Sequence, residues 1–581
     1  MRAIPQREPL FLGGSIGGVP SFDLNFARLD NPVTKYGFVF TRATSATYVN
    51  STGLIATAAS GELRYTYDPV TLSALGVLIE EARTNLLLYS QAFDAATAYW
   101  GLVNAAAVTA NTVQSPSGST DAEDLVETAF AGSRMSCSRT SFLGGGTGAH
   151  TLSFYVKRRP GSLVRHVRLL LGDAALSNYA QAFINVDTGA INSASAAGAS
   201  PPTGVSGGAQ LLSGGWVRVW VTGTFATTVS YASLWCTDAA FLTSYTGDTS
   251  SGFHVWGAQV EAGAFPTSYI PTAGAAATRN ADVLSLTGAA GRTNLIVGSA
   301  APITQNVTVT AVPYTLSQTG SGTITLSGAS TAGPLVGAGS LTFTPSAGTL
   351  TLTMSGSPAE VQLETGSTAT TYIPTTSGPR TVENVASWFS GDAGTWVIEL
   401  IGLSAASAST IPAILCVGMG TTSSNEDTLF VNSSKRIGCD ARSGGTTVWS
   451  LPQSATPGDG AGISVAHAYA VDDAAVSYSG AAAVTDTSCP LPFRLDRVSI
   501  GSFVARGTSG YGYLNSTISR IRYYNSRIPD DDLLLLSNGV DLSTPLKGGR
   551  ARKRLVYIVK QDDDLDSLIE SLSQESVRDY L

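Results

Sequence analysis

The stretch Gly257-Ala258-Gln259-Val260-Glu261, followed by Thr267-Ser268-Tyr269-Ile270-Pro271-Thr272, occurs twice in the chain in slightly altered form. Its second copy is Glu360-Val361-Gln362-Leu363-Glu364, followed by Thr370-Thr371-Tyr372-Ile373-Pro374-Thr375. The pentapeptide alternates apolar and polar residues as a strand does, and a proline follows it in both copies. This repetition indicates that one β-rich module is present twice.

The same tetrapeptide, Arg-Thr-Asn-Leu, precedes both copies, at residues 83–86 and 292–295. From the arginine to the tyrosine, the first copy spans 186 residues (269 − 83) and the second spans 80 (372 − 292). The period is therefore not constant. Unequal spacing excludes a solenoid and favours one module in a long and a short version.

Composition shows what kind of domains the chain builds. A chain of 581 residues is too long for a single hydrophobic core, so about two to four domains are expected. Hydrophobic residues make up 43%, charged residues only 13%, and glycine reaches 62, which is typical of short strands joined by small-residue turns. Alternating runs such as 216–221 and 340–344 predict antiparallel strands in two-sheet sandwiches.

Charge and apolar runs exclude several classes of protein. With a net charge of −8 and no broad basic stripe, no nucleic-acid partner is expected. No apolar run reaches the roughly 18 residues that span a bilayer, and the N-terminus lacks the apolar stretch of a secretory signal, so we expect no membrane insertion. The cysteines form no Cys-x-x-Cys pair and are expected to be buried thiols: Cys137, Cys236, Cys416, Cys439 and Cys489.

The C-terminal third has a pattern of its own. Alternating runs at 395–400 and 517–524 predict further strands, and Ile528-Pro529-Asp530-Asp531-Asp532-Leu533 predicts a capped helical turn after the last one. Beyond Lys547 the tail is first basic and then acidic. Apolar residues at helical spacing predict an amphipathic helix for docking or oligomerisation: Leu565, Leu568, Ile569 and Leu572.

Several of these segments together resemble a known family pattern. Phe40-Thr41-Arg42-Ala43-Thr44-Ser45-Ala46-Thr47-Tyr48-Val49, Gly76–Leu86 and Trp256–Thr272 resemble a recurring pattern of phage tail-fibre, spike and head-fibre proteins, over about residues 36–286. The resemblance implies a jelly-roll sandwich like a carbohydrate-binding module for the first copy. Residues 387–543 resemble laminin-G or concanavalin-A-like sandwiches, chiefly through Gly512–Ile528. Neither resemblance transfers a catalytic residue to this chain.

We therefore expect an all-β chain of tandem β-sandwich modules, jelly-roll and concanavalin-A-like, with an N-terminal attachment region and a short, partly helical C-terminal tail. The expected parts are 1–76, a virion-attachment or packing region; 77–286, the first jelly-roll sandwich; 287–386, the second, shorter sandwich repeat; 387–543, the concanavalin-A or laminin-G-like sandwich; and 544–581, the tail with its amphipathic helix.

Carboxylates are the residues to weigh for enzymatic chemistry. Cleavage of a glycan needs two acids about 5–10 Å apart, and Glu80, Glu81, Glu261 and Glu364 are the candidates. Each lies inside a repeated module border, which favours a structural role for them. We expect no catalytic residue and no enzyme, with a glycan depolymerase as the alternative.

Aromatic residues in glycine-rich surroundings are the candidates for sugar binding. Trp449, Tyr511 and Tyr513 could stack on sugars or pack at the rim of the core. Trp216, Trp220 and Trp256 lie in strand patterns and are expected in the core.

No motif indicates a cofactor or a metal site. The four histidines lie nowhere at the spacing of a helical metal site, and the aspartate clusters follow no EF-hand pattern. Helix capping is favoured over calcium binding at Asp530–Asp532.

The sequence thus favours a structural subunit of a bacteriophage virion, as tail fibre, spike or head fibre, that attaches to glycan on the host surface. A purely architectural subunit without a receptor is a second alternative. By analogy with elongated β-fibres we expect a homotrimer, with other virion proteins and host polysaccharide as partners. We expect the protein to be made in the host cytoplasm and assembled on the particle.

Overall fold

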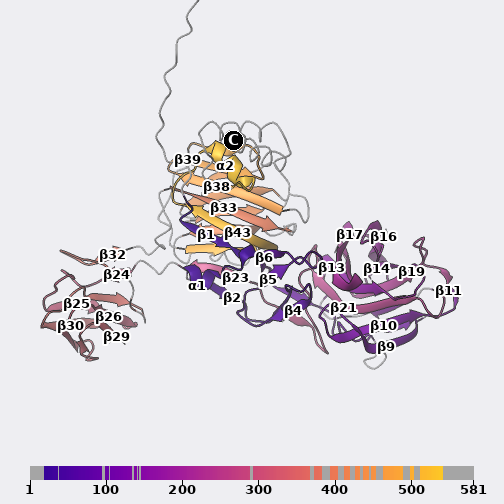
Figure 1. The fold of residues 1–581 in the computed structure, drawn as a ribbon, viewed down its shortest axis with the longest axis horizontal. Helices are drawn as coiled ribbons and strands as arrows, with labels where there is room; N and C mark the ends of the chain where they lie inside the picture. The colour runs from indigo at the N-terminus through magenta and orange to yellow at the C-terminus, as the bar shows by residue number, and fades with distance from the viewer. Residues whose placement is uncertain are drawn as a thin grey trace, which may run out of the picture.

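A computed structural model describes residues 19–540 with internal gaps, at 37, 94–98, 104, 134–135, 141, 143–144, 288–291, 367–368, 370–371, 383–392, 403–410, 419–425, 432–435, 444–445, 453–461, 489–496 and 503–510. The described chain is almost entirely antiparallel β-sheet, which confirms the expected fold class. Figure 1 shows three bodies, named here the host sandwich, the first module and the second module.

The host sandwich has two sheets. The first follows the order β40 (Val484–Asp486), β39 (Asp473–Tyr478), β38 (Gly462–Ala470), β33 (Ala393–Ile401), β43 (Ser516–Tyr524), β6 (Ala74–Ile79) and β5 (Tyr65–Tyr67), with β1 (Phe22–Asn25) also on β43. The second follows β2 (Val39–Thr41), β23 (Val283–Thr287), β41 (Arg497–Ile500), β34 (Ile411–Gly418), β35 (Glu426–Val431), β36 (Ile437–Ser443) and β37 (Thr446–Pro452), with β42 (Tyr511–Gly512) parallel to β34.

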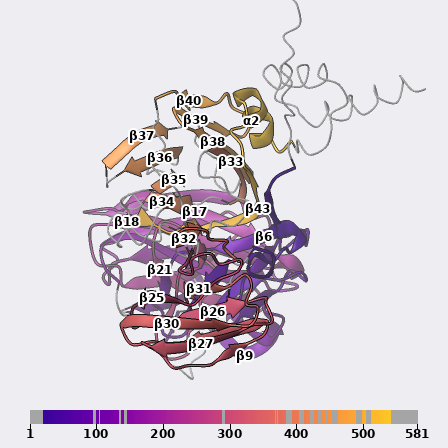
Figure 2. The same ribbon diagram turned by 90° about the vertical axis from the view of Figure 1, so that its left-hand side faces the viewer.

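Alternation along β38 explains how the host sandwich packs on both faces of its first sheet. Val465 and Tyr469 point into the core between the sheets, together with Phe22 and Trp396. Ala466 and Ala468 face the opposite side of the sheet. They lie against the short helix α2 (Asp530–Ser537), which packs on β38 and β39 (Figure 2). Small side chains let the helix approach the sheet closely.

Helix α2 follows the last strand, as the sequence predicted. Its first turn holds Asp530, Asp531 and Asp532, where carboxylates suit the positive end of the helix dipole. Pro529 is the N-cap residue and makes no side-chain hydrogen bond. The aspartates therefore act through charge at the helix start, and the chain leaves the helix at Gly539, whose φ is 82°.

The first module is a sandwich of two six-stranded sheets. One follows β17 (Thr203–Leu211), β18 (Val217–Phe225), β13 (Gly148–Arg158), β21 (Gly252–Ala262), β10 (Thr120–Glu127) and β9 (Ala105–Gln114). The other follows β16 (Ile191–Gly198), β15 (Asn178–Ile184), β14 (His166–Gly172), β19 (Tyr231–Thr237), β12 (Ser136–Thr140) and β8 (Gly101–Val103). A core that includes Phe154, Leu169 and Val219 separates the sheets. A small pair, β11 (Ala131–Ser133) and β20 (Tyr245–Thr246), adds to it.

The second module is smaller but built on the same principle. One sheet follows β25 (Gln305–Val309), β30 (Gly348–Ser355), β27 (Thr323–Gly328) and β28 (Leu335–Val336), and the other follows β29 (Gly339–Phe343), β26 (Tyr314–Gln318) and β31 (Gln362–Thr365). Leu316, Leu350 and Leu363 lie in its core. The second module is thus a sandwich with fewer strands than the first.

Both modules are insertions whose first and last strands pair with each other. In the first module β7 (Arg83–Asn85) pairs with β22 (Ala277–Arg279), and in the second β24 (Arg292–Asn294) pairs with β32 (Arg380–Val382). Between the two modules the chain returns to the host sandwich as β23, which pairs with β2 and β41. The repeated Arg-Thr-Asn therefore marks the strand at which each module begins.

This arrangement corrects the expected linear division of the chain. The boundary between residues 76 and 77 falls inside β6, and β1, β2 and β5 from the first 76 residues are strands of the host sandwich. Phe22 lies opposite Tyr523 in the register of β1 and β43. The host sandwich is thus discontinuous, because apolar strands from both ends of the chain bury one shared core.

A hairpin from the host sandwich also covers the first module. It consists of β3 (Ala46–Val49) and β4 (Ile55–Ala58), and Ile55 packs with Trp216 and Trp256 on the outer face of the β13 sheet. Trp216 and Trp256 are buried, as predicted, and Trp220 is half-buried. Residues 1–18 and the tail 544–581, with its predicted helix, lie outside the described residues.

Candidate functional site

One of the predicted acids, Glu80, is part of a buried charge cluster where the host sandwich meets the first module. Glu80, at the end of β6, accepts hydrogen bonds from Arg64 Nη1 at 2.7 Å and Arg279 Nη1 at 2.6 Å, and also from the backbone and hydroxyl of Ser268. Asp282 pairs with Arg64 and with Arg42. Burial alone would raise the pKa of Glu80, but the two arginines outweigh it and lower that pKa to about 2.

The other predicted acids are also fully engaged by neighbouring groups. Glu261 accepts from Gln259 Nε2 at 2.7 Å and from the backbone and hydroxyl of Thr267. Glu364 accepts from Gln362 Nε2 at 2.8 Å, and Glu81 pairs with Arg83. Each of these carboxylates is held in place by neighbouring side-chain or backbone donors. Their geometry is that of structural residues.

The predicted sugar-binding aromatics are not brought together on one strand pair. Trp449 lies on β37, the edge strand of its sheet, while Tyr511 lies on β42, which pairs with β34 three strands away. The side chains of both lie outside the described residues, and Tyr513 is half-buried.

A groove with suitable chemistry lies elsewhere, at the open side of the host sandwich. We name it the edge groove, because it lies between the edge strands β2 and β5 and has a volume of about 680 Å³. The helical segments η1 (Phe26–Arg28) and α1 (Pro32–Tyr36) flank it. Its lining residues are Leu29, Asn31, Val33, Thr34, Phe38, Val39, Phe40, Tyr48, Asn50, Ser51, Gly61, Glu62, Leu63, Tyr65 and Tyr67.

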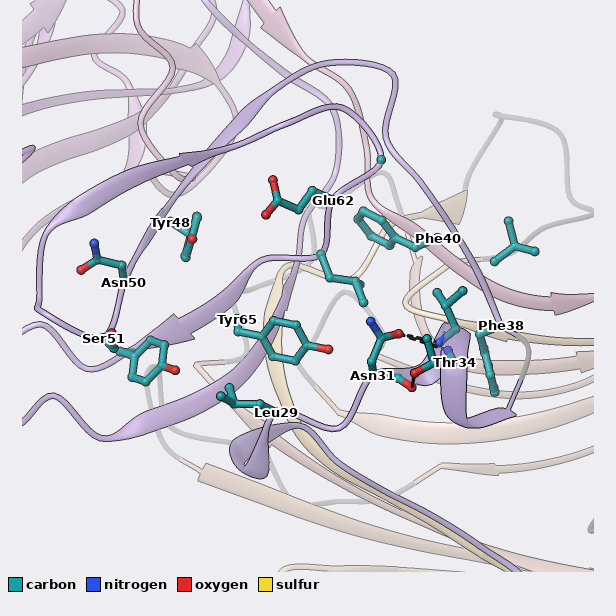
Figure 3. Close-up of a pocket in the computed structure, with 15 residues that line it drawn as sticks. Leu29, Asn31, Thr34, Phe38, Phe40, Tyr48, Asn50, Ser51, Glu62 and Tyr65 are labelled. Atoms are coloured by element: carbon teal, nitrogen blue, oxygen red, sulfur yellow. Dashed lines mark hydrogen bonds between the residues drawn. The ribbon is translucent and has the colours of Figure 1, made fainter.

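Three half-buried tyrosines supply aromatic surface to the edge groove, namely Tyr48, Tyr65 and Tyr67. Figure 3 shows Tyr65 projecting into the middle of the groove, with Glu62 and Phe40 on one side of it and Leu29 on another. Tyr65 donates its hydroxyl to the backbone oxygen of Asp30 at 2.9 Å. This bond fixes the orientation of the ring.

Tyr65 and Tyr48 remain neutral at physiological pH because the pKa of each is raised. Burial and the nearby Asp30 raise the pKa of Tyr65 to about 12. Burial, then Glu62 and Tyr67, raise the pKa of Tyr48. Glu62 is the one charged side chain among the residues that line the groove. The edge groove therefore offers rings and hydroxyl groups with little net charge.

Turns hold the polar groups around the groove in place. Asn50 Oδ1 accepts from the backbone of Thr52 and Leu54, and Asn31 Oδ1 accepts from the backbone of Val33 at 2.9 Å. The amide nitrogens of both asparagines have no hydrogen-bond partner among the described residues. Each asparagine is thus fixed through its oxygen, while its NH₂ group can donate to a ligand.

Sequence reasoning did not point to the edge groove. Its tyrosines come from two short strands, and the intervening apolar rim comes from residues 29–40. Exposed apolar side chains in that rim are Leu29 at 50%, Val33 at 42% and Val39 at 49% exposure. The available signal was the alternation Tyr65-Thr66-Tyr67, which places two rings on one face of a strand.

A second feature that the sequence did not predict is a polar cluster buried in the core of the host sandwich. His467 Nε2 lies 2.9 Å from Asp427 Oδ2 across the two sheets, and Cys439 lies beside the same imidazole. Asp427 overcomes the effect of burial and raises the pKa of His467 well above its usual range. All three are buried. Despite its Cys-His-Asp composition, this group is a packed core contact among the described residues.

The free cysteines in the described residues, Cys236, Cys416 and Cys439, are buried, as predicted. No cluster of three or more His, Cys, Asp or Glu side chains suited to a metal ion occurs in the part of the chain that the structure describes. Among the described helices, none has the length and apolar content to cross a membrane.

Fold and groove together define a multi-module β-sandwich protein with a tyrosine-lined groove at the edge of one sandwich, uncharged apart from Glu62. No protein-family model and no curated protein matches the sequence. Similar solved structures include the CBM40 of the Ruminococcus gnavus IT-sialidase bound to alpha2,6 sialyllactose, at 20% identity and a TM-score of 0.23, covering 27% of this chain and 88% of that chain.

Two whole sialidases are also similar over a limited region. They are the leech intramolecular trans-sialidase, at 17% identity and a TM-score of 0.22, and NanB from Streptococcus pneumoniae, at 17% identity and 0.23. The matches cover 26% and 27% of this chain, and 24% and 25% of those chains.

Proposed function

We propose that the protein is a structural subunit of a bacteriophage virion that attaches to glycan on the host cell surface through the edge groove. The observation that carries the glycan part is the set of three tyrosine rings beside fixed amide groups in one groove. Sugars present apolar C–H faces and hydroxyl groups, so they bind where flat rings lie next to hydrogen-bonding groups. Tyr48, Tyr65, Asn31 and Asn50 provide both.

Attachment without cleavage is the favoured form of this function. Hydrolysis of a glycosidic bond ordinarily requires two carboxyl groups on either side of the bond. Glu62 is the one carboxylate among the lining residues of the edge groove. Of the module-border acids, Glu80, Glu261 and Glu364 are buried and hydrogen-bonded, and Glu81 pairs with Arg83. This distribution supports a binding protein, with depolymerisation as the outcome that a chemical test would reveal.

The virion role is supported by the resemblance of residues 36–286 to fibre, spike and head-fibre proteins and by the modular β architecture. Sandwiches that carry independent inserted modules suit an elongated surface appendage. We propose a homotrimer assembled on the particle with other virion proteins, since closed symmetry is the rule in homo-oligomers. Mass photometry checks this part, because a trimer has three times the chain mass of 59.8 kDa.

The binding test uses the full chain and host cells. Tyr48→Ala and Tyr67→Ala are expected to reduce cell binding and glycan-array signals by roughly tenfold or more, because each removes a ring face. Tyr179→Ala is the matched control, since Tyr179 is a half-buried tyrosine on β15 of the first module. Equal losses in all three variants, or none, would argue against the edge groove.

The virion part has its own test. Immunogold labelling of particles of the phage whose genome encodes the chain is expected to decorate an external appendage. Unlabelled particles would overturn the virion role. Labelled particles whose protein binds no glycan would indicate an architectural subunit, and new reducing ends after incubation with host polysaccharide would indicate a depolymerase.

A further inference from the structure

A second groove lies on the first module and differs in charge from the edge groove. We name it the basic groove. It has a volume of about 410 Å³, within the roughly 300–1,000 Å³ range of small-molecule sites. Three successive cations line it, Lys157, Arg158 and Arg159, against a single carboxylate, Asp187. The chain as a whole has a net charge of −8, so this excess of positive charge in the groove is local.

The position of the groove follows from the fold. β13 ends at Arg158, and the turn after it closes through a hydrogen bond from Ser162 N to Arg159 O. Trp216, just before β18, forms the neighbouring wall, and Val70 reaches in from the β5–β6 turn of the host sandwich. The groove is therefore built from both bodies. Their relative placement fixes its width.

The three cations differ in how firmly the protein holds them. Arg159 Nε lies 3.1 Å from both oxygens of Asp124, and its Nη1 donates to Ser250 O at 2.7 Å. That guanidinium is already engaged. Arg158 donates from Nη1 to Ser162 O at 3.2 Å and pairs through Nε with Asp187 at 2.9 Å. The two side chains of this ion pair are 35% and 37% exposed, so water screens it and it contributes little.

Lys157 differs from the two arginines, because it has no partner in the part of the chain that the structure describes. No hydrogen bond or ion pair to Lys157 occurs among the described residues. Lys157 lies two residues after Tyr155 on β13, so both side chains are on the outer face of the sheet. Its aliphatic stem lies beside Gly215, and it lines the groove together with Trp216. Together with Trp216, it also lines an adjoining groove of about 220 Å³. An ammonium group placed between two cavities is positioned to meet an anionic ligand.

We propose that the basic groove binds a carboxylate-bearing sugar unit of an acidic polysaccharide, with Lys157 and Arg158 as its anion-binding residues. This inference rests on the proposed glycan attachment and names the sugar class at a second site. The sugar carboxylate would accept a hydrogen bond from the Lys157 ammonium group. It would also replace Asp187 as the partner of Arg158, so that a bidentate pair takes the place of the solvent-screened ion pair. The indole edge and the apolar wall would contact the sugar ring.

Other anionic partners fit the groove less well. Two available cations are too few for a nucleic acid, which contacts a row of basic residues along its backbone. An acidic peptide usually gains affinity by pairing with an edge strand, but β13 is paired on both sides, with β18 and β21. A single sugar carboxylate needs only a compact pair of cations, which is what the groove contains.

The test measures binding of the full chain to polygalacturonate, alginate and hyaluronan, each beside its carboxyl-reduced form. The wild type is expected to bind at least one acidic polymer roughly tenfold or more tightly than its reduced form, and Lys157→Met to lose that difference while Lys157→Arg retains it. Arg158→Gln provides a second variant. Arg380→Gln, an exposed cation on the second module, is the matched control and is expected to bind within about twofold of wild type.

The outcomes separate this inference from the function on which it rests. Equal binding to the reduced polymers, or full binding by Lys157→Met, overturns the basic groove as an anionic site. Binding to neutral glycans that depends on Tyr48, with none to any acidic polymer, also overturns it and leaves the edge groove intact. Absence of binding to every glycan and to host cells overturns both. Circular dichroism of each variant shows that a loss is not unfolding.

Discussion

Asn85 and Asn294 make the same four hydrogen bonds in two different modules, 209 residues apart (294 − 85). Each donates its amide to two backbone oxygens, those of Ala258 and Ile270 for Asn85 and those of Val361 and Ile373 for Asn294. Each accepts from two backbone amides, Leu87 and Val260 in one module and Ile296 and Leu363 in the other. One buried side chain thus ties the first strand of a module to its last two segments.

A glutamine completes this arrangement in both modules. Gln259 donates to Glu261 and accepts from the backbone of Ile270, while Gln362 donates to Glu364 and accepts from Ile373. All of these groups are buried. A buried polar group needs a hydrogen-bond partner, so the asparagine, the glutamine and the glutamate occur together in each module. The repeated motif is the chemical signature of a closed module.

Replacing the asparagine should therefore loosen a whole module. Asn85→Ala removes four hydrogen bonds and leaves buried backbone groups unpaired, so we expect a loss of roughly 2–4 kcal/mol in the unfolding free energy of the first module. Urea unfolding followed by tryptophan fluorescence measures it. Thr84→Ala is the control, because Thr84 bonds only to Thr278 at the surface, and it should cost under about 1 kcal/mol. A similar loss in both variants would contradict the assignment.

The buried Glu80 predicts sensitivity to acid at the junction. Its pKa of about 2 in the folded chain lies below the ordinary value of 4.5. The stabilisation is therefore fully present above about pH 4.5 and is lost as the pH falls through about 2, amounting to about 3 kcal/mol. Unfolding measured between pH 7 and pH 2.5 should show this loss, and Glu80→Gln should reduce the slope. An unchanged slope in that variant would refute the role.

The buried His467 predicts the opposite dependence. Its pKa is raised above the ordinary 6.5, so its stabilisation is complete below about pH 6.5 and is lost as the pH rises through the folded value. Cys439 adds no charge there, because burial raises the pKa of its thiol. The host-sandwich transition should weaken in alkali in wild type but not in His467→Gln. A double-mutant cycle with Asp427→Asn should show coupling, and additive losses would exclude the pair.

The second module should be removable. Because β24 and β32 pair antiparallel, with Arg292 opposite Val382, its two ends lie side by side. Deletion of residues 292–382 should leave the host sandwich and first module folded, with one calorimetric transition missing and the others at unchanged temperatures. Deletion of 393–401, which removes the central strand β33, is the contrasting case and should abolish folding of the host sandwich. Collapse of every transition in the first deletion would show that the module supports the others.

Local patterns predicted much of what the structure shows at the level of single elements. Alternation predicted the strands, Asp530–Asp532 predicted the start of α2, and strand position predicted burial of Trp216 and Trp256. The structural role of Glu80 and Glu261 was also anticipated, since residues within a repeated border are constrained by packing. These inferences succeed because each depends on neighbours within a few residues along the chain.

The candidate grooves could not be predicted in the same way. Tyr48, Tyr65 and Phe40 belong to separate strands, and they line one groove only because β2 and β5 are the open edges of two facing sheets. The expected aromatics, Trp449 and Tyr511, share a glycine-rich context but lie on separate strands. Composition around a residue therefore says little about which side chains it meets.

The sequence by itself determined an all-β chain with a module in a long and a short copy, because strand periodicity and a repeated set of buried polar residues are local properties. Only the tertiary structure decided that both modules are insertions into one discontinuous sandwich. Phe22 and Tyr523 share a core although they lie at opposite ends of the chain. The free energy gained by burying apolar surface does not depend on how far apart two strands lie in the sequence. The pairing of strands is therefore determined by the complete fold rather than by local sequence.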